Sequence, residues 1–351
     1  MSQGSTSLPP RSGSRKTVKS PASNKKRKKH PILKAFLFLL FGLIILVGAG
    51  IAYLYMQTNE AIEQVGLPDA EVEKIPVSES VKQKPVAILL MGLDTRSGGG
   101  GLNTDVMMVA AFDPVTKSAT VVTIPRDTKV DVEGYRARKA NQFYADFYSV
   151  ALKEDANRDK SKAELAGMSD AREAIGKLFG INISYSAVIN FQGFVDVVDA
   201  LGGVKVNVDK RMKYTDSHDG TDIDLQKGEQ TLYGKDALDF VRYRQSNDGT
   251  NMSSDFERNE RQAQVIGALT DNLKSLGTLT KLDSLFDAVG NNMKMDMPSS
   301  EIKRLLTTYF GISRSNITFI PLEGTWRSPY VHINEDSLNQ TRAALKAIMD
   351  Q

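Results

Sequence analysis

The sequence contains no cysteine among its 351 residues. A disulfide framework is therefore excluded, and an exported domain of this chain has to be stabilised by its hydrophobic core. Histidine is almost as scarce, and the three copies, His30, His218 and His332, lie outside every motif described below. A serine or cysteine hydrolase, which needs a cysteine or a histidine within its catalytic motifs, is not indicated.

Acidic residues are absent from the first 34 residues, which contain ten Lys or Arg side chains and hardly any apolar ones. Such a segment cannot bury enough apolar surface to fold, so we expect residues 1–34 to form a disordered basic tail. Nucleic-acid binding by the basic run at 25–29 is one alternative. Because this run directly precedes an apolar segment, we expect it to set the membrane topology and to contact anionic lipid, without a nucleic-acid partner.

Charge is also absent from residues 35–56, where Phe, Leu, Ile, Val and Met are interrupted only by Gly, Ala and Tyr. At about 1.5 Å per residue this segment crosses a hydrocarbon core of about 30 Å, which predicts one transmembrane helix. A cleaved signal peptide is the alternative, but its apolar core is usually shorter. The positive-inside rule leaves the basic tail in the cytoplasm. The sequence therefore predicts a single-pass protein of the cell membrane with a cytoplasmic N-terminus and an extracytoplasmic C-terminal domain.

Internal repeats are not evident in the remainder, so a solenoid or a propeller is not indicated. Residues 57–84 are polar and contain two prolines, which predicts an extracytoplasmic stalk, and residues 85–351 are expected to fold. Apolar runs predict strands at 86–91, 105–112, 119–124, 187–191, 204–208 and 317–321. Helical patterns occupy 140–152, 169–179, 191–201, 254–276, 299–309 and 337–349. The sequence therefore predicts an α/β domain with a mixed central β-sheet packed between helices.

Two aspartates stand at the ends of the first two predicted strands. Asp94 follows the strand at 86–91, and Asp105 begins the next. The glycine-rich connection at 98–101 lacks the spacing of a nucleotide-binding loop, but it can bring both carboxylates to one edge of the sheet. Such a pair suits Mg²⁺, which takes one or two carboxylates and completes its shell with water and phosphate oxygens. Ordinary turn aspartates are the alternative.

Arginines occur at the ends of other predicted elements. Arg126 follows the strand at 119–124 through a proline, so it is expected at the same sheet edge as the aspartates, unless it only pairs with Asp127. If residues 239–244 are extended, Arg242 and Arg244 face the same way and form a paired fork for phosphate or carboxylate. An exposed alternating strand is the alternative for this segment.

A helix start is predicted where Ser254 and Glu257 match a capping box. Arg258 then falls in the first helical turn, with Arg261 and Gln262 following along the same face. Free N–H groups and the helix dipole make a helix N-terminus favourable for anions and unfavourable for cations. An arginine placed there indicates an anionic ligand, and pairing with Glu257 and Glu260 is the alternative.

In combination these segments resemble the LytR-CpsA-Psr family of cell-wall glycopolymer ligases, over roughly residues 86–273. The resemblance rests on the following motifs: Leu90-Met-Gly-Leu-Asp94-x-Arg96, Asp105-Val-Met-Met-Val109, Ile124-Pro-Arg-Asp-Thr128, Lys139-Ala-Asn-x-x-Tyr144, Asp199-Ala-Leu-Gly-Gly-Val204, Ala237-Leu-x-Phe-Val-Arg-Tyr-Arg244 and Asp255-x-x-Arg258-x-x-Arg261-Gln262. One departure is that Asn103-Thr104 replaces the basic residue and serine that usually precede the second strand.

The resemblance implies a phosphotransferase with the α-β-α domain of that family. Its donor would be an undecaprenyl-pyrophosphate-linked glycopolymer of the teichoic acid or capsular polysaccharide type, its acceptor peptidoglycan, and its released product undecaprenyl phosphate. Mg²⁺ would be the cofactor, held by Asp94 and Asp105. The pyrophosphate would be bound by a larger set of side chains, namely Arg126, Lys139, Arg242, Arg244, Arg258 and Gln262. Catalysis would rest on Asp94, Arg126 and Arg244, with an aspartate such as Asp94 assisting deprotonation of the attacking hydroxyl.

Two other functions use the same anion site. The chain could be a non-catalytic membrane protein that binds or regulates a lipid-linked polymer, because an anion clamp alone does not establish turnover. It could also be a polyprenyl pyrophosphatase that transfers the phosphoryl group to water. Substitution of Asp94 distinguishes these classes. A regulator that still binds its ligand would keep its function, whereas a ligase would lose its activity.

Overall fold

The computed structural model describes residues 62–69, 72–94, 101–218, 220–275, 289–290, 292–309 and 312–350. The predicted basic tail and the predicted transmembrane segment at 35–56 lie outside these ranges. Within them, no helix is both long enough and apolar enough to cross a membrane.

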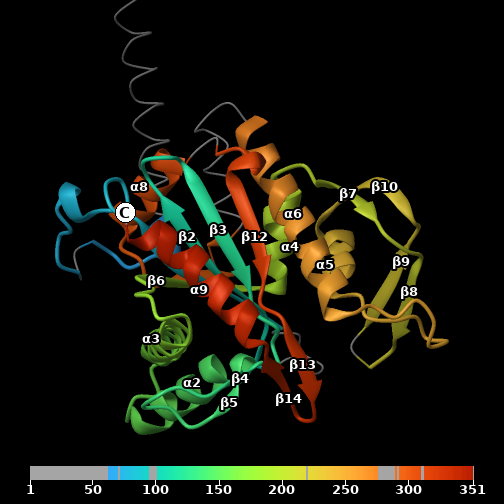
Figure 1. Ribbon diagram of the computed structural model, residues 1–351, viewed down its shortest axis with the longest axis horizontal. Helices are drawn as coiled ribbons and strands as arrows, with labels where there is room; N and C mark the ends of the chain where they lie inside the picture. The colour runs from blue at the N-terminus through green and yellow to red at the C-terminus, as the bar shows by residue number, and fades with distance from the viewer. Residues whose placement is uncertain are drawn as a thin grey trace, which may run out of the picture. The chain divides into compact units, whose positions relative to one another are not determined.

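A six-stranded mixed sheet forms the centre of the domain (Figure 1). Its strand order is β11-β6-β1-β2-β3-β12. Strands β1, β2 and β3 form an antiparallel meander, β6 runs parallel to β1, and β12 runs parallel to β3. The bounds are Val86–Leu93 for β1, Thr104–Asp113 for β2, Ser118–Thr123 for β3, Tyr185–Asn190 for β6, Met293–Met295 for β11 and Ile317–Pro321 for β12. The predicted mixed sheet is therefore confirmed.

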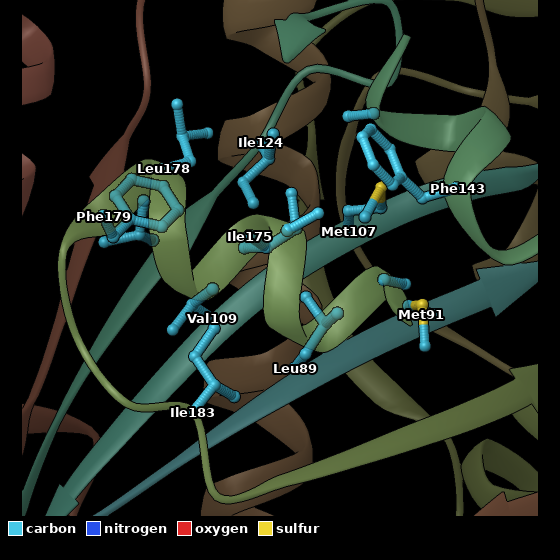
Figure 2. Packing of buried hydrophobic residues seen from close by; sticks show 14 of the residues in the cluster. Leu89, Met91, Met107, Val109, Ile124, Phe143, Ile175, Leu178, Phe179 and Ile183 are labelled. Carbon is cyan, nitrogen blue, oxygen red and sulfur yellow. The ribbon is translucent and has the colours of Figure 1, made fainter. Parts of the chain in front are cut away.

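One face of the sheet is covered by α3 (Lys160–Phe179) and α9 (Glu335–Met349). Alternate residues of the central strands, such as Leu89 and Val109, point into this layer and meet Ile175 and Phe179 of α3 (Figure 2). Helix α2 (Phe143–Glu154) follows the short helix η2 (Ala140–Gln142) and packs on α3. Helix α3 begins nine residues earlier than predicted, because the Asp159 carboxylate caps its first N–H groups.

The opposite face carries α4 (Phe191–Ala200), α6 (Asp255–Ser275) and α8 (Ser299–Tyr309). The intervening strand residues Ile88, Met108 and Ala110 point to this side and pack there with residues of those helices. The sheet is thus enclosed by helices on both faces, which is the predicted α/β arrangement. A strand buried on both faces explains why β1 reads as an uninterrupted apolar run.

A smaller unit extends from this side and has its own core. It contains two antiparallel pairs, β7 with β10 and β8 with β9, together with helix α5. Their bounds are Val204–Val208 for β7, Met212–Asp216 for β8, Thr221–Leu225 for β9, Gly228–Leu232 for β10 and Gly234–Arg242 for α5. The strand predicted at 204–208 is therefore present, but it belongs to this unit and not to the central sheet.

Two short pairs lie below the central sheet in Figure 1. One joins β4 (Lys129–Val130) to β5 (Arg138–Lys139), and the other joins β13 (Gly324–Arg327) to β14 (Tyr330–Ile333). The Val331 N–H donates to the Asp127 carbonyl at 2.9 Å. The β13–β14 hairpin is thereby fixed to the segment that follows β3.

The predicted stalk at 57–84 contributes three residues to the core within the part that the structure describes. Ile62, Val65 and Val81 are buried in one cluster with Met297 and Ile302 of the domain. The Val81 N–H also donates to the buried Glu301 carboxylate at 2.8 Å. This stretch packs on the domain and does not stand apart from it, because its few apolar residues are placed where they can be buried.

Candidate active site

Asp94 and Asp105 lie at the same end of the central sheet. Asp94 directly follows β1, Asp105 is the second residue of β2, and the antiparallel register pairs Leu93 with Thr104. The expected geometry of the two aspartates is therefore observed. Within the part of the chain that the structure describes, no group of three acidic, His or Cys side chains could hold a metal by itself.

Arg126 projects from the end of β3 toward these aspartates. Its guanidinium contacts the Asp105 carboxylate at 2.7 Å and the Asp127 carboxylate at 3.5 Å. The Lys139 ammonium binds the other oxygen of Asp127 at 2.7 Å. The four side chains thus alternate in charge along the order Asp105, Arg126, Asp127, Lys139. Arg126 contacts both Asp127, its neighbour in the sequence, and Asp105, which lies on the adjacent strand.

Arg242 and Arg244 are not paired on a strand, so the prediction for residues 239–244 is wrong. Arg242 is the last residue of helix α5, and Tyr243 leaves the helix with ψ 130°. The helix forms because Ala237, Phe240 and Val241 bury one helical face in the core of the smaller unit. The Arg242 guanidinium then lies over the Phe191 ring, 4.4 Å from its centroid, while Arg244 extends beyond the helix end.

Helix α6 begins with the predicted capping box. Ser254 N–H donates to the Glu257 carboxylate at 2.7 Å, and Glu257 N–H donates to the Ser254 hydroxyl at 3.2 Å. This start places Arg258 in the first turn of the helix. Arg258 and Gln262 both face the cavity described below.

Arg261 differs from these two residues. Its side chain is buried in the protein and only 1% exposed. It binds the Asp209 carboxylate through two nitrogens at 2.8 and 2.9 Å and donates to the Tyr243 carbonyl at 3.1 Å. A further bond joins it to the Ser253 hydroxyl at 3.0 Å. Arg261 therefore fixes both ends of the segment 243–253 that carries Arg244, and it is a positioning residue.

A cavity of ≈ 1160 Å³ connects these side chains. All the predicted site residues line it, namely Asp94, Asp105, Arg126, Lys139, Arg242, Arg244, Arg258 and Gln262. The rest of its wall is largely apolar and comes from β1, β2, α4, α5 and α6, for example Leu90, Met108, Phe194, Leu238 and Ile266. The sequence alone could not distinguish these cavity-wall residues from ordinary core residues, because both groups consist of the same apolar residue types.

Two arginines of the cavity, Arg244 and Arg258, have lowered pKa values. Burial, together with the charges of Arg244 and Arg126, lowers the pKa of Arg258 to about 10. The pKa of Arg244 is also lowered, first by the protein atoms that replace water around it and then by Arg126. Arg244 keeps contact with solvent at the cavity, so its charge is only partly desolvated. Clustered cations repel each other, and a bound polyanion relieves that repulsion.

Asn141 is a cavity residue that the site predictions omitted, although it belongs to the Lys139-Ala-Asn motif. It lines the cavity, is 8% exposed, and donates its backbone N–H to the Arg126 carbonyl at 3.0 Å. Its side-chain Oδ1 is buried without a hydrogen-bond partner among the described residues. An unpaired buried carbonyl oxygen is costly, so this atom is a candidate contact for a ligand.

The fold and the cavity together define an α/β protein with a cluster of arginines at one end of its sheet, beside an apolar channel. Residues 52–347 match the LytR_cpsA_psr family model. The chain therefore belongs to the LytR_cpsA_psr family, as the sequence motifs predicted.

Two curated relatives are polyisoprenyl-teichoic acid–peptidoglycan teichoic acid transferases. TagU of Oceanobacillus iheyensis is 29% identical over 338 residues, which are 93% of this chain and 97% of the relative. TagT of Bacillus subtilis is 28% identical over 342 residues, which are 93% of this chain and 98% of the relative.

Solved structures agree with the fold. Bacillus subtilis TagV superimposes with a TM-score of 0.58 at 26% identity, covering 76% of this chain and 98% of TagV. Protein gbs0355 of Streptococcus agalactiae superimposes with a TM-score of 0.63 at 24% identity, covering 79% of this chain and 92% of the other. The likeness to gbs0355 concerns the fold alone.

Proposed function

We propose that this protein transfers a glycopolymer from undecaprenyl pyrophosphate to peptidoglycan and releases undecaprenyl phosphate. The observation that carries the proposal is the cavity itself, which joins a cluster of guanidinium groups to an apolar channel. A lipid-linked pyrophosphate matches these two parts, because it joins a polyanionic centre to a long apolar chain. The activities of the named relatives support this choice of polymer and acceptor.

The donor would lie along the cavity with its two parts in matching surroundings. Its polyprenyl chain would contact the apolar walls, and its pyrophosphate would lie among Arg126, Arg244 and Arg258, with Lys139, Arg242 and Gln262 around them. Arginine suits this position because its planar fork can make two charge-assisted hydrogen bonds to one phosphate group. Binding would also reduce the repulsion between cations that, after burial, lowers the pKa values of Arg244 and Arg258.

The reaction would form one phosphorus–oxygen bond and break another. The acceptor hydroxyl oxygen would attack the phosphorus that carries the glycopolymer, and the bond from this phosphorus to the bridging oxygen would break. The bridging oxygen leaves with undecaprenyl phosphate, and the hydroxyl proton passes to a carboxylate, for which Asp94 is the proposed acceptor. Arg126 and Arg244 would stabilise the charge that develops on the phosphoryl oxygens, which is the main requirement of phosphoryl transfer.

The carboxylates of Asp94 and Asp105 fit a hard cation, because both line the same end of the cavity and offer only oxygen donors. We infer that they would hold Mg²⁺, with phosphate oxygens and water completing its shell. When bound, Mg²⁺ would neutralise part of the pyrophosphate charge. The predicted membrane segment at 35–56, outside the described residues, would keep the cavity close to a membrane-embedded donor.

The decisive variant is Arg244→Lys, which keeps the positive charge but removes the planar fork. We expect binding of a polyprenyl pyrophosphate to weaken by about 1–3 kcal/mol, the range for hydrogen bonds to charged groups. Isothermal titration of the detergent-solubilised full chain measures this, and transfer of labelled polymer to a peptidoglycan glycan gives the accompanying rate. Arg158→Lys, an exposed arginine that does not line the cavity, is the matched control.

Product analysis in the same assay separates the three functions named for this site. A ligase yields polymer on the glycan, a pyrophosphatase yields free polymer phosphate, and a binding protein yields neither. Unchanged affinity in both Arg242→Lys and Arg244→Lys would contradict the proposed clamp. Full activity after treatment with a chelator would remove the metal from the proposal while leaving the arginines in it.

A further inference from the structure

Trp326 lies on the β13–β14 hairpin, is 55% exposed, and is the only tryptophan of the chain. A tryptophan side chain buries more apolar surface than almost any other, so its exposure on a short, fixed hairpin needs a reason. All four residues of β13 are exposed, whereas Val331 on the paired strand is buried. The hairpin thus presents the indole from a backbone that is itself attached to the domain.

Backbone contacts place the hairpin beside the segment that follows Arg126. Trp326 pairs directly with Val331, so both side chains lie on the same face of the hairpin. Val331 is the residue whose N–H binds the Asp127 carbonyl, and it also forms a bridge with Thr128. The backbone of the hairpin at Val331 therefore lies directly beside the segment that follows Arg126.

Lys139 connects the indole to the proposed reaction centre. Its ammonium lies over the Trp326 ring, 5.8 Å from the ring centroid, and binds the Asp127 carboxylate at 2.7 Å. Lys139 lines the cavity and Trp326 does not, so the indole stands immediately outside the cavity, one residue from its wall. The ammonium contacts the ring while 55% of the residue stays exposed, so the indole still has surface for a ligand in solvent.

We propose that Trp326 is a stacking platform for a pyranose ring of the acceptor glycan. The nonpolar C–H face of a sugar ring packs well on the electron-rich face of an indole, and the sugar hydroxyls stay free at the ring edge. The acceptor must approach the phosphorus from outside, because the proposed donor already fills the apolar channel and the arginine cluster. This inference rests on the proposed function, and it assigns the acceptor side of the same site.

The single tryptophan makes the test direct, because indole fluorescence of the full chain reports on Trp326 alone. Undecorated peptidoglycan glycan fragments, titrated without donor, should change that fluorescence in a saturable way. By calorimetry, Trp326→Ala should weaken fragment binding about three- to tenfold, as expected for loss of one aromatic stacking contact, and Trp326→Phe should restore part of the affinity. Tyr233→Ala is the matched control, since Tyr233 is 60% exposed and precedes α5 in the smaller unit, whereas Trp326 contacts the cavity residue Lys139.

Separate measurements distinguish this inference from the proposed function. Binding of a polyprenyl pyrophosphate without sugar should be equal in Trp326→Ala and wild type. Unchanged glycan affinity in Trp326→Ala would overturn the platform even if the wild-type protein transfers polymer. Tryptophan-dependent glycan binding by a protein without transferase activity would keep the platform and reject the ligase.

Two further outcomes would also overturn the inference. If the indole responds to the sugar of a lipid-free donor fragment and not to the peptidoglycan fragment, the ring belongs to the donor polymer. If it responds to vesicles of anionic lipid and to neither glycan, the hairpin contacts the membrane.

Discussion

Among single residues, Asn141 offers the sharpest test of the cavity wall. Its Oδ1 is buried without a partner among the described residues, yet the residue lines the cavity next to the arginine cluster. Leaving a buried acceptor unpaired costs about 1–3 kcal/mol, and a hydrogen bond from a ligand or a water that accompanies it would recover that cost.

We therefore predict that Asn141→Ala lowers transferase activity about tenfold or more and changes the melting temperature little, because no protein hydrogen bond to Oδ1 is lost. Steady-state transfer assays and thermal unfolding measure the two effects. Thr123→Val is the matched control, since the Thr123 hydroxyl is also buried and unpaired but does not line the cavity. Normal activity in Asn141→Ala would assign the residue a purely structural role.

Among the elements, helix α6 has an N-terminus that is stabilised by an ionised carboxylate. The Glu257 carboxylate accepts hydrogen bonds from Lys210 and from Ser254, and these contacts lower its pKa from the ordinary 4.5 to about 2. A group whose pKa is lowered by folding stabilises the protein above its unfolded pKa, and the contribution disappears as the pH falls through the folded value. The stabilisation by Glu257 is thus complete above pH 4.5 and lost toward pH 2.

We predict that Glu257→Gln is less stable than wild type at neutral pH and that this difference shrinks as the pH falls from about 4.5 to about 2. Thermal unfolding of both proteins across this pH range provides the measurement. Glu229→Gln, which removes an exposed pair with Lys205, should change stability only slightly. A difference between Glu257→Gln and wild type that is independent of pH would show that the carboxylate charge does not stabilise the helix start.

The segment 239–244 shows why local patterns can mislead at this scale. An arginine at every second position fits an exposed strand, but the apolar residues at 237, 240 and 241 fit one face of a helix. The helix prevails because that face has a core to pack against, and sequence periodicity does not reveal where that core is. Both arginines still reach the cavity, because the helix ends at Arg242 and the chain turns at Tyr243.

For the whole molecule, the predicted topology places the cavity outside the cytoplasm. The basic tail before the uncharged segment at 35–56 predicts that residues 57–351 are extracytoplasmic. Protease added to intact wall-stripped cells should then degrade the domain and spare an epitope at the N-terminus. Lysed cells, in which both parts become accessible, are the control, and protection of the domain in intact cells would reverse the topology.

The sequence by itself determined most elements of the central domain and the end of the sheet where the polar residues gather. Apolar runs such as 86–91 become strands because both faces of the sheet are covered, and Ser254 with Glu257 begins α6 because their side chains satisfy each other's backbone N–H groups. Both signals, the apolar run and the capping pair, lie in neighbouring residues, so they can be read from the sequence.

Only the tertiary structure decided which of the arginines face the cavity. Arg258 and Arg261 are one helical turn apart, yet the first lines the cavity and the second is buried against Asp209, which lies 52 positions away in the chain. The apolar channel and the position of Trp326 beside Lys139 also depend on contacts between distant segments. Such contacts are set by packing across the whole domain, and no local pattern records them.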